Sequence, residues 1–518
     1  MAQIVIADIE VYDPSIPGTR TLRYATQGYT TKPTDTPANT YYEGRIRQPA
    51  NIQRTMFSRN ATTGATRIGY GALELVNIDG ALDPLLEYSF VGRPITIKLG
   101  TVLPTSGGTP TWVTVLRGTM EQAEFSWRVV TIRVRDRLLD LAKPIQQTRY
   151  AGNNALPNGL EGVANDINGK PKPLVFGRVW NIAPPCVNTA RQIYQIHEGS
   201  AIQSLGEVYD RGVPLSVGPA YTSQADMEAN TPASNHYRMW NSAAGCFIRL
   251  HGTPNGLVTA DVLRGAAVSN RTVGQLFNQI LLAAGIPSGD INSADITALD
   301  AAVGYECGVY AGVQSDTTPI ELLDELCASV GAYYTTDASG QFRIGRVVLP
   351  TSGSVGTLTA TDILKIDRVS SRDPGVGVPA WKVKVGYRKI EQVQNDLGNT
   401  VTDARKAFFQ EEYRRVEASD AAVKTANLLA PEMEFLTVLS SESDANAEAS
   451  RLLTLYKTRR DMYEVSVRVD SALASVLDIG KVVTMQLPRF GMSAGKLFLI
   501  IGVTTNMRGY QFDLTLWG

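Results

Sequence analysis

The cysteines are the first residues to test for metal or redox chemistry. The chain of 518 residues has four of them, Cys186, Cys246, Cys307 and Cys327. No two have the two-residue spacing of a zinc ribbon or a redox motif. We therefore expect reduced, buried thiols and neither an iron–sulfur nor a zinc site.

The three histidines also lack the spacing of a catalytic or metal site. They are His197, His236 and His251, and none lies in a paired-histidine or zinc-protease motif. His197, followed by Glu198 and a glycine, forms only a fragment of such a motif. We expect all three to be structural or solvent-exposed.

Motifs for nucleophilic or phosphate chemistry are missing. The sequence has no Gly-x-Ser-x-Gly elbow, no Walker lysine loop and no dinucleotide-binding glycine fingerprint after a strand. Glu321, Asp324 and Glu325 could be considered for glycosidase chemistry, but solvation on an exposed helix flank explains them. We expect no enzyme, no catalytic, metal-binding or cofactor-binding residue, and no cofactor.

The charge balance gives no overall attraction to nucleic acid or to an anionic membrane. Lys and Arg number 49 against 50 for Asp and Glu, a formal net charge of −1. The most basic segment is residues 128–137, where Val130, Ile132 and Val134 alternate with polar residues. We interpret it as a strand with one solvent-exposed side.

The first ten residues predict a strand. They lack the basic start and the long apolar stretch of a signal peptide. No segment of the chain approaches the roughly 18 consecutive apolar residues that a membrane helix needs. We therefore expect assembly in a host cytoplasm without stable membrane insertion.

The elements that position these residues follow from the hydrophobic periodicity. The chain is long enough for about three or four domains. Residues 1–145 are mostly β, because period-two segments such as 95–99 and 112–116 are separated by Gly, Pro and Thr clusters, which favours a barrel or sandwich. Residues 152–173 are typical of a crossing loop, and short strands follow, with a hairpin turn at Asp210.

The middle of the chain changes period from two to 3.6. Thr272 caps a predicted helix that Gly285 ends. A second helix has Thr318 as N-cap and Glu321 as capping-box partner, and a hairpin within residues 332–347 follows it. The expected buried face of the second helix is Ile320, Leu323, Leu326, Cys327 and Val330.

The last part of the chain returns to β around one long helix, expected at about residues 444–458. Its predicted inner face is Ala445, Ala449, Leu452, Leu455 and Tyr456. The strands expected after it are 463–469, 481–487, 496–503 and 511–516. They imply a final β-barrel.

Several segments resemble hub proteins of phage tails. Near the C-terminus the resemblance lies in the segments AEASRLLTLY (447–456), YEVSV (463–467), LDIGKVV (477–483), PRFG (488–491) and LTLWG (514–518), which are similar to the closing domain of such hubs. Near the N-terminus it lies in GALELVNIDGALD (71–83) and GRPITIKLG (92–100), which look like the opening barrel. The helix and hairpin at 318–347 resemble the middle module.

The expected fold class is α+β, mainly β. The expected fold is multidomain, with two β-barrel-like hub domains and a smaller helix-plus-hairpin module between them. We expect an N-terminal β-barrel-like hub domain at 1–145, a β-rich second domain at 146–265, the helix-plus-hairpin module at 266–350, and a C-terminal domain with the long helix and closing β-barrel at 351–518.

The resemblance implies a structural protein of the tail tip of a long-tailed, siphophage-type bacteriophage, related in organisation to hubs of contractile tails and gene transfer agents. Such a hub is a homo-oligomer, a trimer whose two barrels per chain form a six-fold-like ring. It joins tail-tube and distal tail proteins to a central spike or fibre. It also closes around the tape-measure protein and gates genome ejection, so DNA is present only in transit and the protein belongs to the virion.

Two other functions stay open on the sequence alone. The 21 tyrosines and the many Thr, Asn and Gly residues suit a carbohydrate-binding receptor protein with a Tyr/Asn-lined groove, and they equally suit sheet surfaces and subunit contacts. A tail-associated cell-wall hydrolase would depend on a carboxylate or on His197. Whether the polar loop at 389–406 contacts a fibre is also left open.

Overall fold

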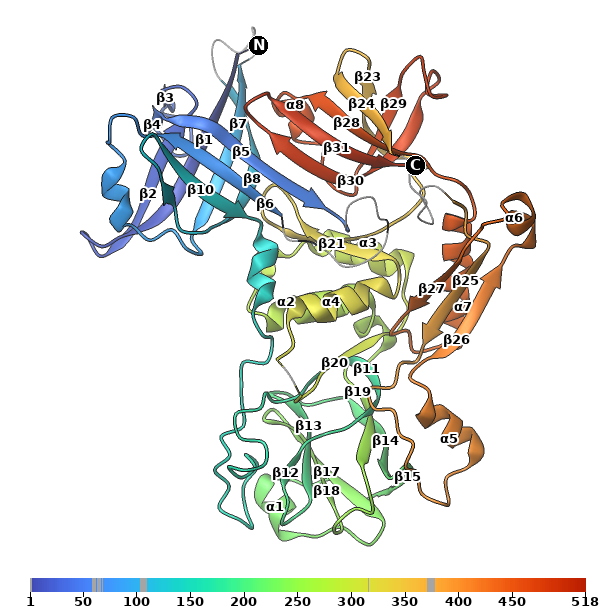
Figure 1. Ribbon diagram of the computed structural model, residues 1–518. Helices are drawn as coiled ribbons and strands as arrows, with labels where there is room; N and C mark the ends of the chain where they lie inside the picture. The colour runs from blue at the N-terminus through green and yellow to red at the C-terminus, as the bar shows by residue number, and fades with distance from the viewer. Residues whose placement is uncertain are drawn as a thin grey trace. The chain divides into compact units, whose positions relative to one another are not determined.

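The computed structural model describes residues 2–57, 62, 67, 69–102, 110–314, 316–369 and 378–518. The protein is mainly β, with 41% strand and 18% helix, which confirms the expected class (Figure 1). Two compact units are formed: the first by Met1–Asp140, Tyr333–Pro379 and Leu455–Gly518, the second by Leu141–Ala332 and Ala380–Thr454. The four-domain division stays a prediction.

The first unit is built on one sheet of sixteen strands in the described part of the chain. Its main path runs β24-β28-β31-β30-β5-β6-β10-β8-β7-β1-β2-β4-β3, and β9, β23 and β29 pair beside it. The strands are β1 (Ala2–Asp13), β2 (Gly18–Ala25), β3 (Tyr29–Thr30), β4 (Tyr41–Gly44), β5 (Ile46–Thr55), β6 (Tyr70–Val76), β7 (Pro94–Val102), β8 (Pro110–Met120), β9 (Glu124–Phe125), β10 (Val129–Arg135), β23 (Ser354–Thr359), β24 (Ile363–Val369), β28 (Met462–Arg468), β29 (Val482–Gln486), β30 (Lys496–Asn506) and β31 (Gln511–Trp517).

The alternation expected from the sequence is present in β10 and β28. In β10, Val130, Ile132 and Val134 are buried, whereas the residues between them are half-buried or exposed. In β28, Val465 and Val467 are likewise buried, whereas Glu464 and Ser466 are half-buried and Arg468 is exposed. Because successive side chains of a strand point to opposite faces, these two strands have one face in the core and one face toward water.

The two closed barrels are not confirmed. Among the described residues the strand path is open, with β24 at one end and β3 at the other. The antiparallel pairing of β5 with β30 was not expected. It places strands from both ends of the chain in one ladder.

Smaller elements complete the first unit. The hairpin expected after the second helix is present, and its two strands pair with each other. The elements are the 3-10 turns η1 (Asp83–Glu87) and η2 (Arg137–Ala142), hairpin strands β21 (Ala332–Thr336) and β22 (Phe342–Arg346), and helix α8 (Ser471–Ala474).

The second unit contains two five-stranded sheets. One has the order β15-β14-β19-β11-β20 and the other β12-β13-β18-β17-β16. Their strands are β11 (Leu174–Ile182), β12 (Cys186–Asn188), β13 (Ile193–Glu198), β14 (Ser204–Asp210), β15 (Val213–Pro214), β16 (Ser216–Val217), β17 (His236–Ser242), β18 (Gly245–Leu250), β19 (Val258–Leu263) and β20 (Gly308–Ala311). The hairpin predicted at Asp210 is the β14–β15 turn.

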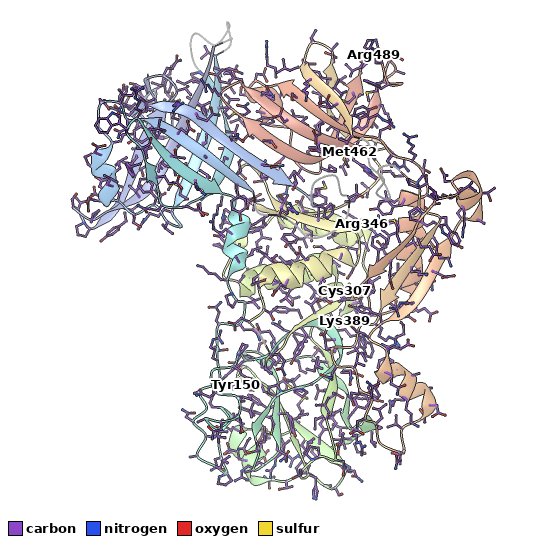
Figure 2. The ribbon with its side chains drawn as sticks, in the orientation of Figure 1. Tyr150, Cys307, Arg346, Lys389, Met462 and Arg489 are labelled. Carbon is purple, nitrogen blue, oxygen red and sulfur yellow. The ribbon has the colours of Figure 1, made fainter. Side chains whose placement is uncertain are left out.

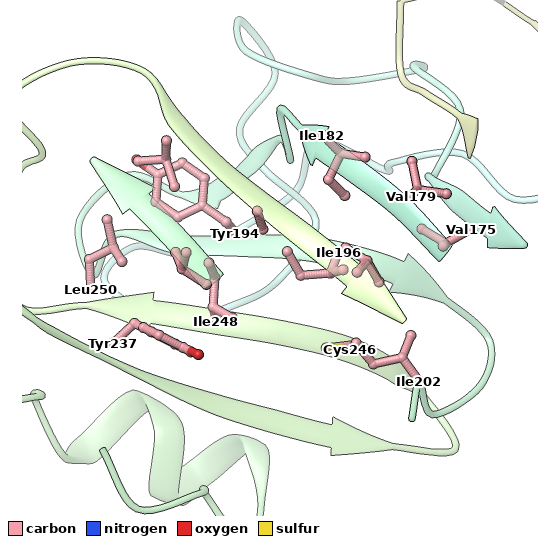
Figure 3. Packing of buried hydrophobic residues seen from close by; sticks show 14 residues of the cluster. Val175, Val179, Ile182, Tyr194, Ile196, Ile202, Tyr237, Cys246, Ile248 and Leu250 are labelled. Carbon is pink, nitrogen blue, oxygen red and sulfur yellow. The ribbon is translucent and has the colours of Figure 1, made fainter. Parts of the chain in front are cut away.

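A single apolar cluster joins these two sheets. Val179 of β11 and Val262 of β19 come from one sheet, and Ile196 of β13 and Ile248 of β18 come from the other (Figure 3). All four side chains are buried. Since each sheet contributes alternate inward-facing residues, this part of the second unit is a β-sandwich.

The two capped helices form as predicted. The side chain of Thr272 accepts from the backbone N–H of Gln275 at the start of α2 (Val273–Ala283). At α4 (Pro319–Ala328), Thr318 Oγ1 accepts from the Glu321 N–H at 3.3 Å, and a Glu321 carboxylate oxygen accepts from the Thr318 N–H at 2.8 Å. The buried face of α4 is shifted from the expected stripe, because Leu322 is buried and Ile320 is only half-buried.

The remaining elements of the second unit include a three-stranded sheet of order β26-β25-β27. The long helix is α7 (Glu442–Tyr456), and its whole expected inner face is buried. The other elements are α1 (Gln224–Ala229), η3 (Val268–Asn270), η4 (Ser288–Asp290), α3 (Ser293–Ala302), β25 (Lys382–Tyr387), α5 (Asp403–Gln410), β26 (Arg414–Ser419), α6 (Ala421–Ala426) and β27 (Glu432–Leu436).

The sandwich core predicts a large difference between two leucines that are seven residues apart. Leu250 belongs to the core cluster and is 4% exposed, whereas Leu257 is 45% exposed. We expect Leu250→Ala to lower the free energy of unfolding by about 2–5 kcal/mol, because it leaves a cavity. Leu257→Ala should change it by no more than about 0.5 kcal/mol in urea titrations. Equal effects of the two substitutions would contradict the sandwich.

Candidate functional site

The four cysteines are free thiols. Cys246, Cys307 (labelled in Figure 2) and Cys327 are buried, and Cys186 is half-buried. Burial raises the pKa of the Cys186 thiol to about 11 and raises the pKa of the other three thiols as well. Since the thiolate is the reactive form, all four are poor nucleophiles at neutral pH. In the described ranges, no group of three or more His, Cys, Asp or Glu side chains could hold a metal ion.

His197 is a neutral structural residue in β13. Its side chain is 1% exposed, and its Nδ1 accepts from the backbone N–H of Val175 at 3.0 Å. The remaining ring proton is therefore on Nε2, which donates to Ser200 Oγ at 3.0 Å. Burial, with a smaller contribution from the positive charge of Arg264, lowers the pKa of His197 to about 3. The ring thus offers no free base to a substrate.

The other two histidines hold a loop in place. His236 Nδ1 donates to the carbonyl oxygen of Ser234 at 2.8 Å, and His251 Nδ1 donates to that of Pro232 at 2.7 Å. His236 is half-buried and His251 is exposed. Both act as local hydrogen-bond donors to the segment before β17.

The carboxylates of α4 have structural partners. Glu321 completes the capping box, and Glu325 Oε1 accepts from Lys389 Nζ at 2.6 Å. Asp324 is half-buried on the same helix. These contacts stabilise the helix start and tie α4 to the segment after β25, so Glu321 and Glu325 have structural roles.

Buried carboxyl groups that the sequence did not reveal lie elsewhere. Asp261 in β19 accepts from the Asn181 N–H at 2.8 Å and from the Tyr209 hydroxyl at 3.0 Å. Burial raises the pKa of Asp261 to about 6. Asp136 accepts backbone N–H groups from Gly69 and Leu138, and burial likewise raises its pKa to about 6. A polar residue in a strand pattern gives no signal of such burial.

The polar loop at 389–406 is bound along the second unit. Its Glu391 N–H donates to the Trp180 carbonyl at 3.0 Å, and its Gly398 N–H donates to the Arg211 carbonyl at 2.8 Å. Arg405 forms an ion pair with Glu207 and lies over the ring of Tyr209, 5.2 Å from its centroid. The end of the loop borders a groove of about 850 Å³.

The contact between β5 and β30 joins the two ends of the chain. Thr55, Arg54 and Gln53 pair with Gly502, Val503 and Thr504 in antiparallel register. Further polar contacts join N-terminal and C-terminal segments of this unit, and only the first of them lies beside β5 and β30. They are Ile52 N–H to Thr505 Oγ1, Tyr510 hydroxyl to the Gln3 carbonyl, Gln3 Nε2 to the Val469 carbonyl, and Ser471 N–H to Thr101 Oγ1.

Arg54 is the buried charge at this junction. Its side chain donates to the carbonyl oxygen of Thr336 at 2.5 Å and lies 2.9 Å from Asp478 Oδ1. A guanidinium that is almost fully buried needs such partners, because an unpaired buried charge is strongly destabilising. Arg54 therefore connects β5 to the β21–β22 hairpin and to the segment before β29. The sequence alone did not single it out.

Three large apolar side chains are almost fully exposed in the isolated chain. Trp127, between β9 and β10, is 91% exposed, and Leu428 and Leu429, between α6 and β27, are 86% and 90% exposed. Single exposed apolar residues are normal on a protein surface, whereas contiguous apolar patches mark interaction sites. In the described residues, no helix combines the length and apolarity needed to cross a membrane.

Comparison with known proteins gives structural neighbours only. No family model and no curated protein matches the chain. Solved structures that match include a prophage MuSo2 tail protein from Shewanella oneidensis, with 13% identity, TM-score 0.39 and coverage of 99% of this chain and 98% of that one. A tail protein from Neisseria meningitidis MC58 has 9% identity, TM-score 0.43 and coverage of 100% and 97%.

A third match is a prophage tail protein from Listeria monocytogenes EGD-e, with 8% identity, TM-score 0.40 and coverage of 100% and 94%. All three are tail proteins, the class that the sequence segments resemble. Their TM-scores lie below 0.5, so the likeness by itself carries no argument about assembly or partners.

The environment of His197 predicts a pH-dependent stability difference. Its folded-state pKa of about 3 lies below the ordinary value of 6.5, so the unfolded chain binds the proton first as the pH falls. Stability from the neutral ring is complete above pH 6.5 and is lost below it. The variant His197→Asn keeps an acceptor for the Val175 N–H and cannot titrate.

Relative to His197→Asn, we expect the natural protein to lose about 2 kcal/mol of unfolding free energy between pH 7 and pH 5, measured by urea titration. His251→Asn, at an exposed position, is the control and should give a profile parallel to that of the natural protein. A parallel profile for His197→Asn would contradict the assignment.

Proposed function

We propose that the chain is a structural subunit of a phage tail tip that forms the central baseplate hub. In this proposal it assembles as a homotrimer, joins tail-tube and distal tail proteins to a spike or fibre, and gates genome ejection. It performs no catalysis and carries no cofactor. The observation that carries the proposal is the pairing of β5 with β30, which unites in one sheet the two end segments that resemble hub proteins.

The resembling segments lie in strands of this sheet. Residues 71–83 and 92–100 cover most of β6 and most of β7. Residues 463–467 and 514–518 lie in or next to β28 and β31, which pair with each other. In this proposal the two hub-like end segments of each chain give six such segments in a trimer, a number that matches a six-fold tail tube.

The surface of the isolated chain supports an assembled state. Trp127, Leu428 and Leu429 expose nearly their whole side chains to water, and covering them would remove that apolar area from solvent. A net charge of −1 imposes little repulsion between copies. These features suit a chain that works inside a larger particle.

The hydrolase alternative is less well supported by the described residues. His197 is buried with both ring nitrogens bonded, and the carboxylates of α4 serve in a cap and an ion pair. A general base must reach a substrate proton, which this buried ring does not do.

The proposal predicts the mass of the assembly and its place in the virion. Native mass spectrometry of the purified chain should give a species of three times 56.1 kDa. Electron microscopy of virions labelled at the C-terminus of this protein should place the label at the tail tip. A strictly monomeric chain that is absent from purified tails would refute the hub.

A further inference from the structure

A pocket of about 550 Å³ lies on the second sheet of the sandwich, away from the groove beside the 389–406 loop. Its apolar floor consists of Trp240 of β17 and Phe247 of β18, whose rings stack with centroids 5.4 Å apart and planes 22° apart. Both rings pack against a buried cluster that contains Tyr150, which Figure 2 labels. The volume is in the usual range for small-ligand sites.

Charged groups form the polar side of this pocket. Lys172 Nζ lies 2.7 Å from Glu161 Oε1 and 3.9 Å from Glu198 Oε1. All three side chains remain in part exposed, at 12% for Lys172, 33% for Glu161 and 19% for Glu198. A carboxylate oxygen can accept more than one hydrogen bond and an ammonium has three protons to donate, so each group keeps capacity for a ligand.

The two carboxylates are held in place before any ligand arrives. Glu161 Oε2 accepts from the Ala151 N–H at 3.0 Å, and Glu198 Oε2 accepts from Gln195 Nε2 at 2.5 Å. Gln195 is buried, and its own carbonyl oxygen accepts from the Tyr150 hydroxyl at 2.5 Å. Because these side chains are already ordered, binding would cost little conformational entropy.

This combination of groups selects a ligand class. A flat aromatic floor suits a ring with an apolar C–H face, and adjacent carboxylate and ammonium groups suit a rim of hydroxyls through charge-assisted hydrogen bonds. The amide side chains of Asn153 and Gln224 also line the pocket. A saccharide ring has both features.

The net charge of the pocket indicates which kinds of saccharide it would accept. Among the residues that line the pocket, the two carboxylates of Glu161 and Glu198 face the single ammonium of Lys172. Phosphorylated, sulfated or acidic ligands would meet this excess negative charge. We propose that the pocket binds a neutral or amino sugar unit of a polysaccharide, a binding activity that a hub does not by itself require.

The test is a calorimetric titration of the full chain with chitotriose, maltotriose and a glucosamine trimer, and with a galacturonic acid trimer as the anionic comparison. We expect saturable binding of at least one neutral or amino trisaccharide, and at least tenfold weaker binding of the anionic one. Absence of saturable binding of every neutral and amino trisaccharide, or preference for the anionic one, would overturn the proposal.

Matched variants locate the binding. Trp240→Ala and the nearly isosteric Glu161→Gln should each weaken the binding at least tenfold, and Trp240→Phe should restore most of it because a ring is kept. The control Trp127→Ala removes an exposed tryptophan elsewhere and should leave affinity unchanged. Because Glu161→Gln preserves shape, it remains informative if Trp240→Ala fails to fold. Unchanged affinity in Glu161→Gln and Trp240→Ala would overturn the assignment to this pocket.

Discussion

The antiparallel contact between β5 and β30 is the constraint on which the first unit depends. Three residue pairs connect strands from opposite ends of the chain, and Arg54 lies buried within the contact. Separating the strands would strip hydrogen bonds from the ladder and remove Arg54 from Asp478 and the Thr336 carbonyl. Backbone pairing and the buried charge therefore stabilise the same junction.

In the second unit, hydrogen bonds to buried polar side chains link strands around an apolar sandwich. His197 links two strands through the Val175 N–H, and Asp261 links Asn181 to Tyr209. Each bond satisfies a group whose burial would otherwise be costly. Hydrogen bonds also hold the carboxylates of Glu161 and Glu198 in fixed positions in the pocket that Trp240 lines. The side chains of this surface pocket are therefore ordered before a ligand binds.

The sequence was informative where the cause of a structure is local. Thr318, Pro319 and Glu321 determine the start of α4 within one turn, and the alternation in β10 determines which of its faces is buried. Helix α3 was not predicted, because only Ile296 and Leu299 of its ten residues are buried and the apolar stripe is correspondingly weak.

Pairing partners and the pocket were beyond such reasoning. Alternation tells which face of a strand is buried and not which strand lies beside it, so the β5–β30 contact left no local signal and two separate barrels were expected instead. The pocket residues also gave no local signal, since Glu161 comes from a loop and Glu198 and Trp240 come from two strands that only pairing within one sheet brings together. The abundance of Tyr, Thr, Asn and Gly suggested carbohydrate as a ligand class, but it did not indicate where on the protein a carbohydrate would bind.

The β5–β30 contact can form only late in synthesis, because its two strands lie near opposite ends of the chain. Ile52 bonds to Thr505, 453 residues further along the chain. At about 5–20 residues per second, the ribosome needs roughly 20–90 s to supply that partner. During this time the edge of β5 has no strand to pair with, while the whole second unit is translated. Pro49 lies in β5 at a shift of its register against β6. Because proline has no N–H to donate and the register is irregular, β5 is a poor template for pairing with a wrong strand before β30 is made.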